Sequence, residues 1–161
     1  MIELAWRSGL RIGEVLALKP KDVDLDGGTI VVRHYKGDRR RVVGIDTGSA
    51  ALVDRWLGVR AKRGISGRVP IFCTLDGHSI DQSYVRHLLP RLAAKAGIDK
   101  RIHAHGIRHA YAASLEREGA TISMIRDLLG HSSAAVTDRY LRRRGAGEAV
   151  EFARNREWSL T

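Results

Sequence analysis

The sequence predicts an α+β fold that is predominantly α-helical and includes a small antiparallel β-sheet. Most of the chain shows apolar residues at helical spacing, in stretches that begin at capping residues and end at glycines. Residues 29–45 instead hold two β-branched runs separated by a short polar segment. The chain has 161 residues, which is enough for one domain with a real core and too few for two well-buried domains. One domain is therefore expected.

The first element is a short helix close to the N-terminus. Residues 2–6 have the pattern of the last turns of an amphipathic helix, and Ser8-Gly9 ends it. The helix begins so close to Met1 that we expect either a missing N-terminal portion or a fragment of a longer protein.

A second helix is expected directly after this break. Its apolar stripe consists of Leu10, Val15, Leu16 and Leu18 and ends at Pro20. Arg11 then lies at the start of the helix and is exposed, with Glu14 on the same polar side. In isolation, Arg11 is best interpreted as an ion pair with Glu14 across one helical turn, worth about 0.2–0.5 kcal/mol.

The two β-branched runs, residues 29–35 (TIVVRHY) and 41–45 (RVVGI), predict a β-hairpin. Lys36-Gly37-Asp38 and two arginines separate the runs, so Lys36 lies at or beside the tip of the hairpin. A helix should follow, from a cap at Thr47 or Ser49 to Gly64.

The next segment holds a short strand and a further helix. Val69 to Cys73 is an apolar run typical of a strand, and its cysteine, the only one in the chain, is expected to be a small core residue. A single cysteine cannot form an internal disulfide, which favours a reducing, cytosolic compartment. A helix is predicted from Asp81 to Ala96, with a kink or a break at Pro90, and Gly97 ends it.

Residues 103–140 combine histidines, an arginine and a tyrosine with an Ala- and Leu-rich helical background. In the first helix, His105 and Arg108 are three residues apart and His109 is four from His105, so the three share one face. Glu118-Gly119 closes this helix.

A second helix in this region is predicted from a cap at Thr121 to Gly130. If it continued to Tyr140, the nine residues from His131 would span about 13.5 Å and half a rotation, so the two side chains would point apart. Gly130, followed by a histidine and two serines, indicates a turn instead. Ser132 or Ser133 would then cap a third helix that carries Tyr140 back toward His131.

The net charge narrows the class of partner. The sequence has 28 Lys and Arg against 18 Asp and Glu, a formal net charge of +10 and a pI near 10.5. Such an excess favours a polyanionic partner. Nucleic acid fits better than a membrane, because no apolar run approaches the roughly 20 residues that span a bilayer and the basic residues do not lie on one amphipathic terminal helix.

Five separated motifs together resemble the tyrosine recombinases, also called phage integrases. They are Ser-Gly-Leu-Arg11-Ile-Gly-Glu, Lys36 in the hairpin, His105-Gly-Ile-Arg108-His109, Leu-Leu-Gly-His131-Ser-Ser, and Tyr140 nine residues later. The resemblance implies that residues 1–145 are the catalytic domain of such an enzyme. That domain would be a mostly helical α+β fold with a small antiparallel sheet, acting on double-stranded DNA without metal, nucleotide or other cofactor.

The chemistry of this reaction explains why these residue types occur together. If Tyr140 attacks a DNA phosphodiester, negative charge builds on the two non-bridging oxygens. Arg11 and Arg108 can hold those oxygens with charge-assisted hydrogen bonds from planar guanidinium groups. His109, next to Arg108, is assigned a supporting role.

The remaining groups move protons. The phenol, with an ordinary pKa of about 10, must lose its proton, and His105 is the candidate base. His131 is a candidate hydrogen-bond donor to the phosphate. Lys36 resembles the family's general acid, which protonates the leaving 5′ oxygen. The product would be a 3′-phosphotyrosine with a free 5′ hydroxyl.

Several residues have alternative interpretations. Arg39, Arg40 and Arg41 are expected to contact DNA phosphates rather than to catalyse. The three histidines of residues 103–109 could instead ligate zinc, but a helix brings only two of them to one face and no cysteine or acidic ligand is well spaced nearby. The expected site contains no metal.

The resemblance also carries expectations about organisation. Family members usually have an N-terminal core-binding domain, which this sequence does not contain. The tail, residues 146–161, has a loose helical spacing and is expected to dock on a neighbouring subunit or, equally, on its own domain. Self-association on DNA as a tetrameric synapse, and a cytoplasmic, nucleoid-associated location, are expected. The alternatives to a recombinase are a type IB-like topoisomerase and an inactive or truncated DNA-binding remnant.

Overall fold

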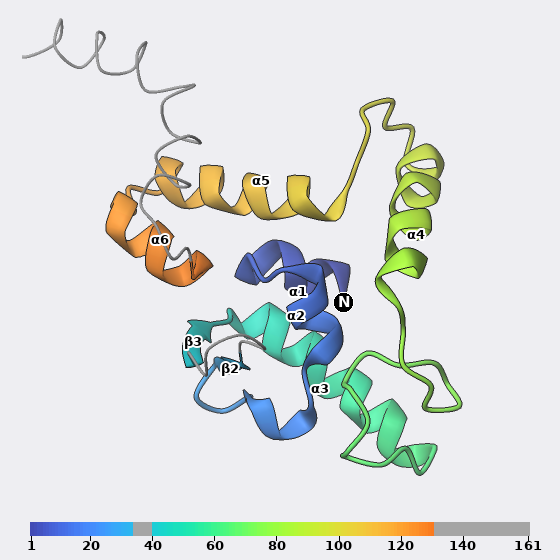
Figure 1. Ribbon diagram of the computed structural model, residues 1–161. Helices are drawn as coiled ribbons and strands as arrows, with labels where there is room; N and C mark the ends of the chain where they lie inside the picture. Colours follow the sequence, from blue (N-terminus) through green and yellow to red (C-terminus); the bar gives the residue numbers. More distant parts are fainter. Residues whose placement is uncertain (34–39, 131–161) are drawn as a thin grey trace, which may run out of the picture.

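The computed structural model describes residues 1–33 and 40–130 and has the predicted predominantly helical α+β fold (Figure 1). The helices and strands of this part of the chain are α1 (Ile2–Ser8), α2 (Ile12–Ala17), the 3₁₀ turn η1 (Pro20–Asp22), β1 (Val23–Asp24), β2 (Thr29–Arg33), β3 (Arg40–Gly44), α3 (Thr47–Lys62), α4 (Gln82–Lys95), α5 (Ala104–Arg117) and α6 (Ile122–Leu129). Among these helices, none is long and apolar enough to cross a membrane.

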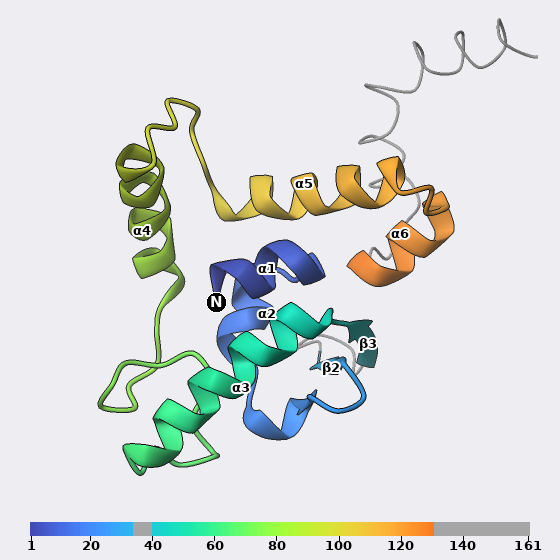
Figure 2. The ribbon, with the colours of Figure 1, turned by 180° about the vertical axis from the view of Figure 1, so that it is seen from behind.

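The two N-terminal helices lie at the centre of the domain. Figures 1 and 2 show α5 running across one side of α1, and α3 lying on the opposite side. The sheet and α6 lie together at one end of the domain, and α4 stands at the other end. Segments from the beginning and from the later part of the described chain therefore meet around α1 and α2.

The sheet has the strand order β1-β2-β3 and is antiparallel throughout. The predicted pairing of the two β-branched runs is confirmed, whereas the two-residue strand β1 was not predicted. Ile30, Val32 and Val43 are buried, because alternate side chains of β2 and β3 face the core. Val32 pairs with Arg41. Because Arg41 is two residues from Val43, it points to the same inner face.

One main cluster of apolar side chains fills the space between the sheet and the helices. It contains Leu4, Ala5, Leu10, Val15, Leu18, Ile30, Val32, Val43, Val53, Ile71 and Phe72. A smaller cluster of Leu16, Val85 and Leu89 joins α2 to α4. Cys73 is buried beside the main cluster, as predicted.

Two glycines end helices in the left-handed conformation and also allow close packing. Gly9 follows α1 with φ of 62°, and a Cβ at this position would lie 2.2 Å from the ring of Tyr111. Gly130 follows α6 with φ of 62°. Both positions therefore require glycine for backbone and for space. The predicted end of α6 is confirmed, and so is its Thr121 cap, whose hydroxyl accepts from the Met124 N–H.

Two local predictions were wrong, and of the two outcomes predicted at Pro90, a kink or a break, the break does not occur. The cap of α3 is Asp46, whose carboxylate accepts from the Ser49 N–H at 3.0 Å, instead of Thr47 or Ser49. Pro90 lies inside α4 without breaking it. Val69 to Cys73 is not a strand.

The segment before Cys73 is bent, and its carbonyls bond to side chains, while Cys73 itself forms an isolated antiparallel bridge with Ser79. The Trp56 indole N–H donates to the Ile71 carbonyl at 2.7 Å. The Arg60 guanidinium, only 2% exposed, donates to the carbonyls of Ser66, Val69, Pro70 and Ile71. These donors satisfy the carbonyls that strand pairing would otherwise engage.

Candidate active site

A cleft of about 710 Å³ lies between the start of α2 and the start of α5. Three of the predicted site residues, Arg11, His105 and Arg108, line it. The other lining residues are Ile12, Gly13, Glu14, Ala17, Arg33, Gln82 and Ala104. The fold thus brings together side chains that are roughly a hundred residues apart in the sequence.

Arg11 lies where the sequence predicted, at the N-cap of α2. Its backbone N–H donates to Glu14 Oε2 at 2.8 Å, and its Nη1 donates to Glu14 Oε1 at 3.1 Å. The side chain of Arg11 is 44% exposed, and that of Glu14 is 10% exposed. The ion pair with Glu14 and a place in the cleft are therefore compatible, since Glu14 holds one side of the guanidinium and the cleft receives the other.

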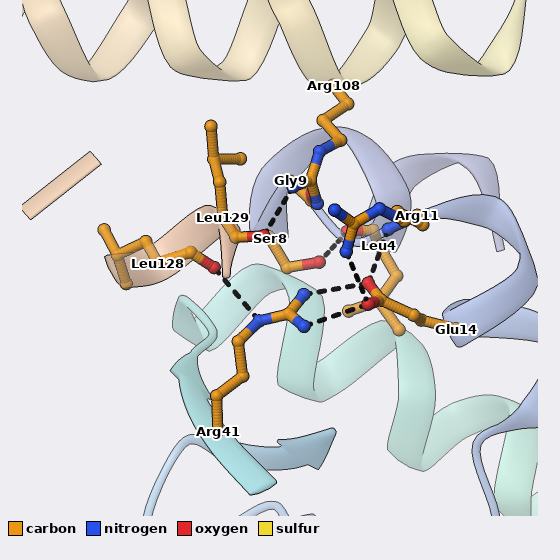
Figure 3. Close-up of polar contacts among 9 residues, drawn as sticks. All are labelled: Leu4, Ser8, Gly9, Arg11, Glu14, Arg41, Arg108, Leu128 and Leu129. Carbon is orange, nitrogen blue, oxygen red and sulfur yellow. Dashed lines mark hydrogen bonds and ion pairs between the residues drawn. The ribbon is translucent and has the colours of Figure 1, made fainter. Parts of the chain in front are cut away.

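Arg108 is held quite differently, because it is buried, with 4% of its surface exposed. Its Nη1 donates to the Gly9 carbonyl at 2.7 Å, and its Nη2 donates to the Leu129 carbonyl. Figure 3 shows the guanidinium reaching from α5 between the end of α1 and the end of α6. Arg108 therefore fixes three helices relative to one another at the cleft.

His105 is exposed at the first turn of α5. Burial, and the positive charges of Arg108, His103 and Arg11, lower its pKa below the ordinary 6.5. Its ring meets the ring of His109 edge to face, with centroids 4.3 Å apart. The imidazole of His105 is therefore neutral near pH 7, which is the form that can accept a proton.

His103 and His109 have structural surroundings of their own. His103 caps α5, because its Nδ1 accepts from the Gly106 N–H at 2.9 Å. Burial, His105, His103 and Arg108 lower the pKa of His109. In the part of the chain that the structure describes, no group of three or more His, Cys, Asp or Glu side chains could hold a metal ion.

Arg41 is not the exposed side chain that a surface phosphate contact would require. It is 11% exposed, and its Nη1 and Nη2 donate to the two carboxylate oxygens of Glu14 at 2.9 and 2.8 Å (Figure 3). Its Nε donates to the Leu128 carbonyl at 3.3 Å. The expectation for Arg41 is corrected accordingly, because its fork faces a carboxylate inside the protein. Arg40, on the other face of β3, is exposed and pairs with Arg33 across the sheet.

Glu14 is the carboxylate on which two of these arginines converge. Burial would raise its pKa, but hydrogen bonds from Arg41 and from the Arg11 backbone, together with both positive charges, lower the pKa to about 2. Glu14 is therefore ionised throughout the physiological range.

Four of the predicted site residues, Lys36, Arg39, His131 and Tyr140, lie outside the described residues, as does the tail. The left-handed Gly130 ends α6 directly before His131, so this helix does not run on unbroken toward Tyr140.

The sequence interpretation missed two contributors to the cleft. Arg33 lines the cleft and bonds Asp22 Oδ1 at 3.0 Å, and Gln82 reaches it from the start of α4. Nothing in the spacing of either residue pointed to the site. Both residues reach the cleft only through the way in which β2 and α4 pack against α2.

Comparison with known proteins adds independent evidence to this geometry. The sequence profile of the phage integrase family matches residues 1–145. The chain belongs to the phage integrase family. One relative is the tyrosine recombinase XerC of Xanthomonas campestris pv. campestris (strain B100), which is 32% identical to this chain over 140 residues. The match covers 87% of this chain and 42% of XerC.

Solved structures agree with the phage integrase assignment. The crystal structure of XerA recombinase superposes with a TM-score of 0.84 at 29% identity, covering 96% of this chain and 57% of that chain. The XerH site-specific recombinase bound to its difH substrate, a pre-cleavage complex, gives a TM-score of 0.76 at 29% identity, with 86% and 41% covered. The chain spans about half the length of the relatives it matches.

Proposed function

We propose that residues 1–145 form the catalytic domain of a site-specific DNA recombinase, which cleaves and rejoins DNA through a 3′-phosphotyrosine intermediate. The observation that carries this proposal is the meeting of Arg11, His105 and Arg108 at one cleft. Membership of the phage integrase family supports it.

In the proposed reaction, the phenol oxygen of Tyr140 attacks a DNA phosphorus, and the bond from phosphorus to the 5′ oxygen breaks. Arg11 and Arg108 donate to the non-bridging oxygens, where negative charge increases in the transition state. The two guanidiniums approach from α2 and α5, which gives them different directions toward one phosphate. Because the phosphotyrosine keeps the energy of the phosphodiester, rejoining needs no ATP, and the guanidiniums supply the positive charge without a metal.

The two protons of the reaction go to and from different groups. His105 accepts the proton of the Tyr140 phenol, in keeping with its lowered pKa and its place at the rim of the cleft. Lys36 donates a proton to the leaving 5′ oxygen. His131 donates a hydrogen bond to the phosphate, and His109 supports His105 through their ring contact.

The proposed partner is double-stranded DNA. The net charge of +10 supports this, as does the DNA-bound state of the related XerH structure. Arg33 and Arg40 lie opposite each other on β2 and β3, and we propose that they contact DNA phosphates. Arg39, the residue before Arg40 in the sequence, is proposed to do the same. We further propose that the protein acts in the cytoplasm on the nucleoid and self-associates on DNA as a tetrameric synapse, with residues 146–161 docking on a neighbouring subunit or on their own domain.

The test is the capture of a covalent protein–DNA adduct. The full chain is incubated in EDTA with a library of nicked duplexes of randomised sequence, denatured, and the attached DNA is sequenced. We expect an adduct on a defined sequence with the wild type and none with Tyr140→Phe. An adduct of equal yield with Tyr140→Phe, or no adduct from any duplex in the library, would contradict the proposal.

The rate of adduct formation is expected to fall at acidic pH. Only neutral His105 can accept the phenol proton, and its pKa lies below 6.5, so the loss of rate should lie below that pH. Single-turnover rates between about pH 5 and pH 8 on the selected duplex measure the effect. His105→Gln should lower the rate about a hundredfold and remove the acidic limb. His87→Gln, at an exposed histidine on α4, should keep the fall in rate at acidic pH. If that fall were unchanged in His105→Gln, a group other than His105 would cause it.

A further inference from the structure

We propose that Arg41 is a positioning residue for strand cleavage, which holds the Arg11 guanidinium and the turn before His131 in one fixed arrangement. This inference rests on the proposed function. It assigns Arg41 a role inside the protein, and no direct contact with DNA.

The first link runs from Arg41 through Glu14 to Arg11. Arg41 forms a two-pronged ion pair with both Glu14 oxygens, at 2.9 and 2.8 Å, and both side chains are about nine-tenths buried. The same carboxylate accepts from the side chain and from the backbone of Arg11. Planar, bidentate pairing fixes the orientation of a carboxylate, so the position of Glu14 determines where Arg11 points in the cleft.

The second link runs from Arg41 to the end of α6. Its Nε donates to the Leu128 carbonyl at 3.3 Å, while Arg108 donates to the next carbonyl, that of Leu129. A Cβ at Gly130 would lie 2.8 to 3.0 Å from three side-chain atoms of Arg41. The guanidinium therefore packs against the left-handed residue that immediately precedes His131.

The third link is strand β3, which carries Arg41. Arg41 is five residues after Lys36 in the sequence. It lies opposite the buried Val32 in the sheet, so both side chains are on the inner face. One side chain thus touches α2 and the end of α6 and is covalently part of the hairpin. Each of these three segments carries or adjoins a group of the proposed reaction, namely Arg11, His131 and Lys36.

A buried ion pair is weak evidence for stability, because desolvation offsets most of its attraction. Its geometric effect is larger, since misplacing a reacting group by about 1 Å can cost a hundredfold in rate. A positioning role therefore predicts a loss of rate with bound DNA, and not merely a loss of folded protein.

The kinetic test compares Arg41→Gln and Arg41→Lys in the full chain with a matched control, Arg126→Gln. Arg126 is an ion-paired arginine on α6 with 40% of its side chain exposed. The rate of adduct formation is measured against DNA concentration on the selected duplex. Arg41→Gln should lower the rate at saturating DNA by roughly tenfold to a hundredfold and leave the half-saturating concentration unchanged. Arg41→Lys keeps the charge but lacks the planar fork of the guanidinium. It should fold as the wild type does and regain only part of the rate that Arg41→Gln loses.

A second measurement needs no DNA. Inorganic phosphate is titrated into the full chain, and the ring resonances of His105 report binding in the cleft. Arg41→Gln should weaken phosphate binding severalfold, whereas Arg126→Gln should bind as the wild type does. The double variant Arg41→Gln with Glu14→Gln should bind phosphate no more weakly than the weaker-binding of the two single variants. Both substitutions act on Arg11 through the same carboxylate, so their effects should not add.

The outcomes separate the two proposals. If the wild type forms the adduct and Arg41→Lys matches it in rate and in phosphate binding, the positioning role is wrong and the recombinase function stands. If no adduct forms with any duplex but Arg41→Gln still weakens phosphate binding, the recombinase function is wrong, and Arg41 positions Arg11 for phosphate binding only. A half-saturating DNA concentration that rises in Arg41→Gln while the rate at saturation holds would also overturn the inference, because it would make Arg41 a DNA contact.

Discussion

Arg108→Met is expected to lose both adduct formation and about 2–5 kcal/mol of folding stability. The buried carbonyls of Gly9 and Leu129 each lose their donor, at a cost of about 1–3 kcal/mol apiece. In the proposed reaction the transition state also loses one of its two guanidiniums, which costs about a hundredfold or more in rate. Urea denaturation followed by circular dichroism measures the free energy of unfolding, and adduct formation on the selected duplex measures the rate.

Arg11→Met is the matched control, because the same residue type is exposed at the other side of the cleft. It should lower the rate by a similar factor while changing the free energy of unfolding by less than about 1 kcal/mol. If both variants were equally destabilised, the assignment of Arg108 as the arginine that joins three helices would be wrong. If either variant kept the wild-type rate, that arginine would have no part in phosphate stabilisation.

Arg60→Met is expected to cost about 2–4 kcal/mol of stability. The part-buried carbonyls of Val69 and Pro70 receive hydrogen bonds from Arg60, and an acceptor left without a donor costs about 1–3 kcal/mol. Removing the buried charge recovers part of this loss, which is why the expected cost is lower than two full penalties. The effect is measured as a shift of the urea midpoint.

Arg55→Met is the control for this prediction. It removes an arginine from the same helix α3 at an exposed position, and should change stability by no more than about 0.5 kcal/mol. A midpoint for Arg60→Met within error of that for Arg55→Met would mean that the loop before Cys73 holds its shape without the guanidinium.

The sequence was most informative where a few neighbouring residues decide the structure. The limits of α6 follow from Thr121 and Gly130, because a hydroxyl cap and a left-handed glycine act within one turn. The exposed helix start at Arg11 follows in the same way. Motif order then predicted that Arg11, His105 and Arg108 belong together, and the cleft that they line agrees with it.

The sequence was least informative where a partner lies far along the chain. Arg41 was expected to contact a DNA phosphate, and its Glu14 partner, 27 residues away, was not foreseen. The two-residue spacing between Arg41 and Val43 nevertheless indicated that both side chains lie on one face of the strand. Val69 to Cys73 looked like a strand because its apolar pattern does not reveal that Arg60 and Trp56 satisfy its carbonyls. The Asp46 cap of α3 was missed because Thr47 and Ser49 also have capping side chains.

The bond between Arg108 and the Gly9 carbonyl joins residues 99 positions apart. During translation at about 5–20 residues per second, the later partner is therefore made roughly 5 to 20 s after the earlier one. A ribosome-bound nascent chain holds Arg11 for that whole period without Arg108, and so without the complete cleft that both residues line. Such long-range closure also slows folding, because the entropy of closing the loop must be lost before the contact forms. We therefore expect chains truncated before α5 to form no covalent adduct with the selected duplex.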